Sequence, residues 1–166
     1  LASEMLVLGR HAPDAAQALA QVDRSLATGA AREHFARMVS ALGGPADFAE
    51  NPAQHLPRAP VQQPVPAPRD GWVQQVLTRD IGLLVITLGG GRRVASDRVD
   101  PRVGFSGMVA RGQRVQAGEP LAVVHAADAD AAAQAVARLQ QLLVLGDTPP
   151  APAGPLWSAL PEPAAR

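Results

Sequence analysis

Apolar residues in the first part of the chain recur at helical spacing and predict three helices. The first runs over Leu1–Leu8, and Gly9 is expected to stop it in the left-handed conformation that other residues resist. The second begins at Asp14, a residue type that caps helices, and ends at Gly29. The third ends at a Gly-Gly-Pro sequence and carries an apolar inner face of Phe35, Met38, Val39 and Leu42. These helices have too little apolar surface to form a domain alone.

The pattern changes at residues 45–68, where seven prolines favour extended backbone and exclude a helix of useful length. This segment is expected to be a linker with an edge strand at Val61–Val65. Alternation of side chains then predicts a strand at Trp72–Leu77. A dense apolar run predicts a helix at Asp80–Leu88, although Val85–Thr87 would suit a strand equally well.

Four glycines then divide the apolar residues into short pieces and predict two or three short strands, the last at Leu121–His125. Helical spacing returns over residues 128–145, with Asp128 or Asp130 as the cap. The inward face of that helix is expected to hold Val136, Leu139, Leu142 and Leu143. The residues after Gly146 are predicted to form a proline-rich strap. Its apolar side chains Leu156, Trp157 and Leu160 are expected to dock on the rest of the protein. The fold class predicted is α+β, with mixed short strands and packed helices.

The composition excludes several kinds of chemistry but says less about the fold. The 166 residues suffice for one ordinary domain or two small ones, and 15 acidic side chains balance 15 basic ones, so nucleic acid is not an expected partner. Every basic residue is arginine, and cysteine is absent from the sequence. Disulfides, thiolate nucleophiles, thiolate zinc sites, Schiff bases and lysine-linked cofactors are therefore excluded.

No apolar run approaches the roughly 20 residues that cross a bilayer, and the start of the chain lacks the order of a signal peptide. No membrane association and a soluble cytoplasmic setting are therefore expected. The chain begins at Leu1 in what reads as the middle of a helix, without an initiator methionine. We expect it to have been cut out of something longer.

The sequence GGGRR at residues 89–93 invites comparison with an anion-binding loop. Its glycines follow a helix-like segment, whereas phosphate-binding loops place them between a strand and the start of a helix. Helix termination and an exposed or ion-paired turn are the favoured interpretation, and a pair between Arg92 or Arg93 and Asp97 or Asp100 would be enough to explain the arginines. Ser96 is interpreted as a turn or cap residue rather than a nucleophile, because no histidine is close to it in sequence.

The four histidines lie in separate segments without the spacing of metal ligands, so no metal site is expected: they are His11, His34, His55 and His125. His34 is expected at the surface. His125 is expected to end a strand with a hydrogen bond to the backbone. No residue is assigned a catalytic, substrate-binding, cofactor-binding or metal-binding role.

Three passages together carry a family resemblance: MVSALGGPADF at residues 38–48, LVITLGGGRRVASDRVDPRVGFSGM at 84–108, and GQRVQAGEPLAVVHA at 112–126. In this order and spacing, across roughly residues 1–145, the chain resembles the C-terminal half of the pyrimidine-nucleoside phosphorylases of the thymidine phosphorylase type. The resemblance implies a transferase, specifically a pentosyltransferase, of pyrimidine nucleoside metabolism. Its members use inorganic phosphate to cleave thymidine to thymine and deoxyribose 1-phosphate, without a further cofactor.

The resemblance also implies a division of the chain: 1–50 as the terminal helices of the family's α/β domain, 51–68 as a linker, 69–146 as a small α/β hammerhead domain, and 147–166 as a tail. The implied partners are the remainder of a parent chain, the nucleoside and phosphate, and a second copy in a full-length homodimer. The family's base-binding groups and phosphate loop lie upstream, so the fragment is expected to be inactive alone.

A second interpretation stays open. Residues 112–126 also resemble the hairpins of biotinyl and lipoyl carrier domains, which would make the chain a stand-alone binding or carrier module. Such a carrier presents a lysine at a tight turn, and this sequence contains none.

Overall fold

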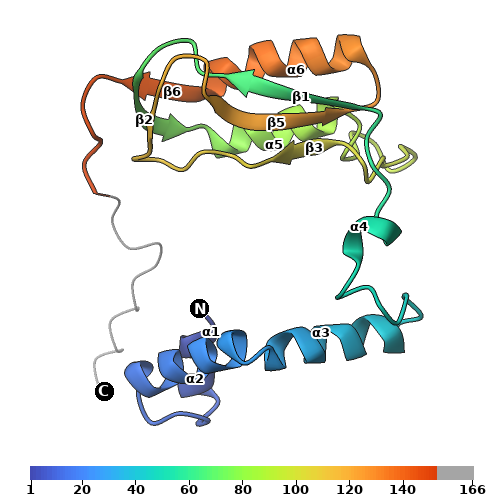
Figure 1. Ribbon diagram of the computed structural model, residues 1–166, viewed down its shortest axis with the longest axis vertical. Coiled ribbons are helices and arrows are strands. Elements are labelled where there is room, and N and C mark those ends of the chain that lie inside the picture. Colours follow the sequence, from blue (N-terminus) through green and yellow to red (C-terminus); the bar gives the residue numbers. More distant parts are fainter. Residues whose placement is uncertain (153–166) are drawn as a thin grey trace, which may run out of the picture. The chain divides into compact units, whose positions relative to one another are not determined.

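The structure is a computed structural model that describes residues 1–152, and it divides into two compact units (Figure 1). The first unit comprises Leu1–Pro57 and is helical. The second begins at Arg58 and combines helices with two small sheets. The α+β class predicted from the sequence is therefore confirmed. Leu156, Trp157 and Leu160, which the sequence offers for docking, lie outside the described residues.

Three helices and one short helical turn form the first unit: α1 (Ala2–Leu8), α2 (Ala15–Ala27), α3 (Ala30–Ala41) and α4 (Pro52–His55). The three predicted helices are confirmed. As predicted, the Asp14 carboxylate begins α2 by accepting a hydrogen bond of 2.8 Å from the backbone N–H of Gln17. Gly29, with φ of 81°, takes the left-handed conformation between α2 and α3.

The end of α1 differs from the prediction. Gly9 has φ of −77°, and its N–H still bonds to the carbonyl of Met5, so it is not the left-handed residue. The chain turns one residue later, at Arg10, whose φ is 58°. Backbone bonds from Arg10 to Val7 and from His11 to Leu6 close the helix end and hold the arginine in this unusual conformation.

Most apolar side chains of the first unit remain exposed. Within the described part of this unit only Ala12 and Ala18 are buried. The predicted inner face of α3 is largely open: Phe35 is 44% exposed, Met38 52% and Leu42 81%. The helical spacing placed these side chains on one stripe, but the prediction that the stripe faces inward is wrong for the described residues.

Two three-stranded antiparallel sheets and two helices form the second unit, in the chain order β1 (Val61–Pro66), β2 (Gly71–Val76), α5 (Thr78–Thr87), β3 (Gly104–Ser106), β4 (Arg114–Val115), β5 (Pro120–Ala126), α6 (Ala129–Leu142) and β6 (Leu143–Gly146). One sheet has the strand order β1-β5-β3 and the other β4-β2-β6. The predicted edge position of β1 is confirmed, and its Pro64 and Pro66 are tolerated because an edge strand needs fewer N–H donors. The predicted helix at α5 and the short strands up to β5 are also confirmed.

The core of the second unit lies where α6 packs on β1 and β5. Its largest fully buried side chains come from several elements: Val65, Val73, Val115, Leu121, Val124, Leu139 and Leu143. Figure 1 shows α6 lying along the sheet that contains β1 and β5. The Asp128 carboxylate caps α6 by accepting from the N–H of Ala131 at 2.8 Å, which settles the choice between Asp128 and Asp130.

The last helix is shorter than predicted. It ends at Leu142 rather than at residue 145, and Leu143–Gly146 forms β6. These residues pair with β2 in a register that joins Leu143 to Val76 and Gly146 to Trp72. Pairing satisfies the backbone and still buries Leu143, so the inward position predicted for this side chain is correct although its secondary structure is not.

Candidate functional site

The glycine-arginine segment after α5 is an ordered turn. Gly89, with φ of 95°, ends α5, which confirms helix termination as the role of the glycines. Its carbonyl accepts a hydrogen bond of 2.9 Å from the N–H of Asp100 and so ties the two ends of the segment together. Inside the turn, Asp97 Oδ2 accepts from the N–H groups of Arg93 at 2.9 Å and Val94 at 3.1 Å.

Of the two alternatives for this turn, exposed or ion-paired, the structure shows the exposed one, since Arg92 and Arg93 are both exposed. Within residues 1–152, neither Arg92 nor Arg93 forms an ion pair with Asp97 or Asp100. Asp97 instead bonds to backbone N–H groups, first Val94 and then Arg93, and these bonds lower the pKa of its carboxyl group. Asp100 pairs with Arg102, the residue two positions further along the chain.

The guanidinium of Arg102 holds the Asp100 carboxylate with two hydrogen bonds, at 2.9 Å to Oδ1 and 2.8 Å to Oδ2. The backbone N–H of Arg102 adds a third, at 3.0 Å. The side-chain bonds are the largest cause, and the backbone bond the next, of a pKa of about 2 for Asp100. Both carboxylates of the turn thus stabilise its conformation.

The hydroxyl partner of His125 is Ser106, a residue that the sequence did not single out. Ser106 Oγ lies 2.7 Å from His125 Nε2, across the pairing of β3 with β5. The ring of His125 thus bonds to a side chain, while its backbone lies in the sheet opposite Gln62 of β1 and Gly104 of β3. Ser96 lies exposed in the turn, consistent with its predicted role. The available signal was the alternation of side chains along β5. Residues 123 and 125 share a face of the sheet, so a residue paired with 123, as Ser106 is, has its side chain on the same face as His125.

The remaining histidines do not converge. His11 and His34 are exposed, which fits the surface position predicted for His34. Nε2 of His55, the last residue of α4, lies 2.8 Å from Asp47 Oδ1, and Asn51 donates to the other carboxylate oxygen at 3.2 Å. These bonds, Asn51 first, lower the pKa of Asp47. Within residues 1–152, no three His, Asp or Glu side chains are grouped as metal ligands.

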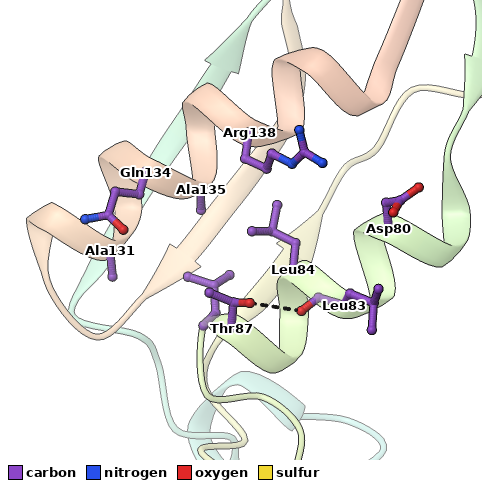
Figure 2. A pocket seen from close by; sticks show the side chains of 9 residues that line it. Asp80, Leu83, Leu84, Thr87, Ala131, Gln134, Ala135 and Arg138 are labelled. Atoms are coloured by element: carbon purple, nitrogen blue, oxygen red, sulfur yellow. Dashed lines mark hydrogen bonds between the residues drawn. The ribbon is translucent and has the colours of Figure 1, made fainter. Parts of the chain in front are cut away.

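An open groove of about 390 Å³ separates α5 from α6. Figure 2 shows Leu84 pointing from α5 toward α6, with Ala135 opposite and Arg138 extending above. The floor is apolar, whereas the rim carries Asp80, Thr87, Gln134 and Arg138. Thr87 Oγ1 is held by the carbonyl of Leu83 at 3.2 Å. A groove with this lining suits an apolar side chain flanked by polar or charged groups.

Residues 72–145 match a family model described as the pyrimidine nucleoside phosphorylase C-terminal domain. The chain is also similar to proteins named thymidine phosphorylase: 53% identical over 152 residues to those of Burkholderia cenocepacia and Burkholderia orbicola, and 48% over 149 residues to that of Agrobacterium fabrum. The Burkholderia matches cover 92% of this chain and 35% of each relative, and the Agrobacterium match covers 90% and 34%. The chain therefore spans about a third of the length of these relatives, and the family resemblance read from the sequence is confirmed.

Proposed function

Residues 72–145 belong to the family of pyrimidine nucleoside phosphorylase C-terminal domains, and from this premise we propose that the chain is the C-terminal part of a thymidine phosphorylase. The extent of the match carries the proposal, because it takes up nine-tenths of this chain and only about a third of its relative. In the parent enzyme, a phosphate oxygen attacks the anomeric carbon of thymidine. The bond from that carbon to the base breaks, and its electron pair leaves with thymine, which takes up a proton.

The chain itself serves as scaffold in this proposal. Its carboxylates and hydroxyls in the second unit mostly bond to neighbouring backbone and side-chain groups, as Asp97, Asp100 and Ser106 do. The groups that hold the base and phosphate belong to the upstream part of the parent, as the resemblance implies. Positioning and electrostatic stabilisation are lost together when those groups are missing, so the chain alone does not turn over.

The open apolar faces of the first unit support an upstream partner. A groove of about 490 Å³ runs between α1 and α2, and its lining includes Met5, Leu6, Val22 and Leu26. Met5 is 72% exposed and Leu26 67%, which is unusual for side chains on a helical stripe. We assign residues 1–50 to the end of an α/β domain whose upstream elements cover these side chains, and residues 69–146 to a hammerhead domain.

The further attributes of the parent follow from the same assignment. They are a homodimer, a cytoplasmic location, inorganic phosphate as co-substrate and no additional cofactor. None of the helices in residues 1–152 combines the length and apolarity needed to cross a membrane. The carrier-module interpretation is not favoured, because the sequence has no lysine to receive biotin or lipoate.

A chimera tests the proposal. The matched C-terminal third of the Burkholderia cenocepacia relative is replaced by this chain, and phosphate-dependent release of thymine is measured. We expect turnover by the chimera, and none by either this chain or the truncated relative alone. Thymine release by the isolated chain would contradict the scaffold role, and an inactive chimera that is folded and dimeric would contradict the family assignment.

A pair of matched variants tests whether the apolar groove of the first unit is covered by upstream elements. Met5→Glu places a charge in the groove and should prevent assembly of an active chimera, because the upstream elements would have to bury an unpaired carboxylate. Val94→Glu changes a side chain of similar exposure, 57%, in the turn of the second unit and should leave assembly intact.

A further inference from the structure

The groove between α5 and α6 is open along a face that the described residues do not cover. Its volume is about 390 Å³, and Leu83 at its lip is 53% exposed. Within residues 1–152, neither Asp80 nor Arg138 on the rim forms an ion pair. The groove therefore combines an apolar floor with two opposite charges that have no charged partner in the described part of the chain.

The C-terminal segment of the same chain has the complementary chemistry. Residues 153–166 bring three large apolar side chains within five positions, Leu156, Trp157 and Leu160, and their charged side chains are Glu162 and Arg166. One acidic and one basic group thus accompany the apolar cluster, as they do on the rim. Prolines on both sides of the cluster, at 155 and 161, restrict the free chain and reduce the entropy lost when it binds.

The segment is also long enough to reach the groove. Gln74 of β2 donates a side-chain hydrogen bond to the carbonyl of Thr148, which places the chain at that point beside β2. Leu84, on the floor of the groove, follows Gln74 by ten residues of which the last steps are helical, so their Cα atoms are at most about 23 Å apart. From Thr148 the chain to Trp157 is nine residues long and spans up to about 30 Å when extended.

We propose that Leu156–Leu160 docks in the groove between α5 and α6, with Trp157 against Leu84 and Ala135 and the flanking charges near Asp80 and Arg138. The bound segment closes the exposed side of both helices from within the same molecule. This inference does not depend on the activity of the parent enzyme, because groove and segment belong to the same chain.

Tryptophan fluorescence of the full chain tests the proposal. The sequence contains two tryptophans, so Trp72→Phe leaves Trp157 as the only reporter. We expect an emission maximum at shorter wavelength than that of a free peptide of residues 153–166, and quenching by acrylamide that is several-fold weaker. Should Trp72→Phe disturb folding, the difference spectrum between the unaltered chain and Trp157→Phe gives the same information.

The second part of the experiment introduces a charge into the groove. In the Trp72→Phe background, Leu83→Glu should shift the emission of Trp157 to longer wavelength and restore quenching toward that of the peptide. Leu19→Glu, at a side chain that is also 53% exposed but lies in the first unit, should leave both unchanged. Three outcomes overturn the proposal: emission like that of the free peptide, protection that Leu83→Glu does not affect, and protection that is lost on dilution, which would mean that a second copy supplies the segment.

Discussion

The hydroxyl of Ser106 lies 2.7 Å from Nε2 of His125 and joins the short edge strand β3 to the central strand β5. The two residues are not directly opposite: Gly104 faces His125, and Ser106 faces Val123. The bond is therefore a diagonal contact on one face of the sheet. β3 has only three residues, so this contact adds to a short ladder of three residue pairs.

Removing this hydroxyl should weaken the second unit. We expect Ser106→Ala to lower the free energy of unfolding by about 0.5–1.5 kcal/mol, the range for one hydrogen bond, and toward its lower end since Ser106 is exposed. Urea unfolding followed by circular dichroism measures the difference. Ser96→Ala, at an exposed turn serine, is the control and should change stability by less than about 0.5 kcal/mol. Equal effects of the two changes would show that the bond to His125 contributes nothing.

A substitution in the core beneath α6 should lower the free energy of unfolding more than the loss of the Ser106 hydroxyl does. Leu139 is fully buried against the two sheets, so Leu139→Ala loses transfer free energy and leaves a cavity, at a cost of about 2–5 kcal/mol. The midpoint of urea unfolding should fall accordingly. Leu83→Ala removes the same atoms from an exposed position and should cost less than about 1 kcal/mol. A similar cost for both leucines would contradict the location of the core.

Local signals in the sequence were sufficient to locate the longer helices, but not the four-residue α4 in the predicted linker. An aspartate before a periodic apolar run identified the starts of α2 and α6, and both carboxylates accept the expected backbone hydrogen bond. The end of α6 was missed because β6 depends on pairing with β2, about 70 residues earlier in the chain. A run such as Leu143–Gly146 suits helix and strand equally well, and only the partner strand decides between them.

Contacts of individual side chains were harder to predict than elements. Sequence proximity suggested that Asp97 and Asp100 would pair with Arg92 or Arg93, but backbone N–H groups and Arg102 are closer to the carboxylates in the folded turn. Ser106–His125 depends on the register of two strands, which the sequence pattern left open. The apolar stripe of α3 was expected to face inward, but Phe35, Met38 and Leu42 are exposed in the described part of the chain. Under the proposed function, upstream elements of the parent cover them.

The cap of α6 should matter to the whole second unit. Asp128→Ala removes the acceptor for the N–H of Ala131 and should destabilise the unit by about 0.5–2 kcal/mol. Asp130→Ala, at an aspartate in the first turn that does not serve as the cap, should cost clearly less in the same urea titration. Asp128→Asn keeps an acceptor at the capping position and should recover most of the loss. A failure of asparagine to recover stability would contradict capping as the cause.

The turn that follows α5 should keep its carboxylates ionised in acid. Asp100 has a pKa of about 2, below the ordinary value of 3.8, because Arg102 binds the charged form. Its contribution to stability is therefore complete above pH 3.8 and is lost as the pH falls through about 2. Carbon-13 NMR of the side-chain carboxyl group during an acid titration reports this midpoint directly.

Replacing the arginine separates the two carboxylates of the turn. Arg102→Gln removes the guanidinium but keeps a backbone donor, so the midpoint of Asp100 should rise most of the way toward 3.8. Asp97 serves as the internal control: its pKa is lowered mainly by the N–H groups of Val94 and Arg93, which this substitution does not touch, and its midpoint should stay low. If the titration midpoints of Asp97 and Asp100 both rose, Arg102 would stabilise the conformation of the whole turn rather than the charge of Asp100 alone. An unchanged midpoint at Asp100 would mean that the bonds from the Arg102 side chain do not determine its ionisation.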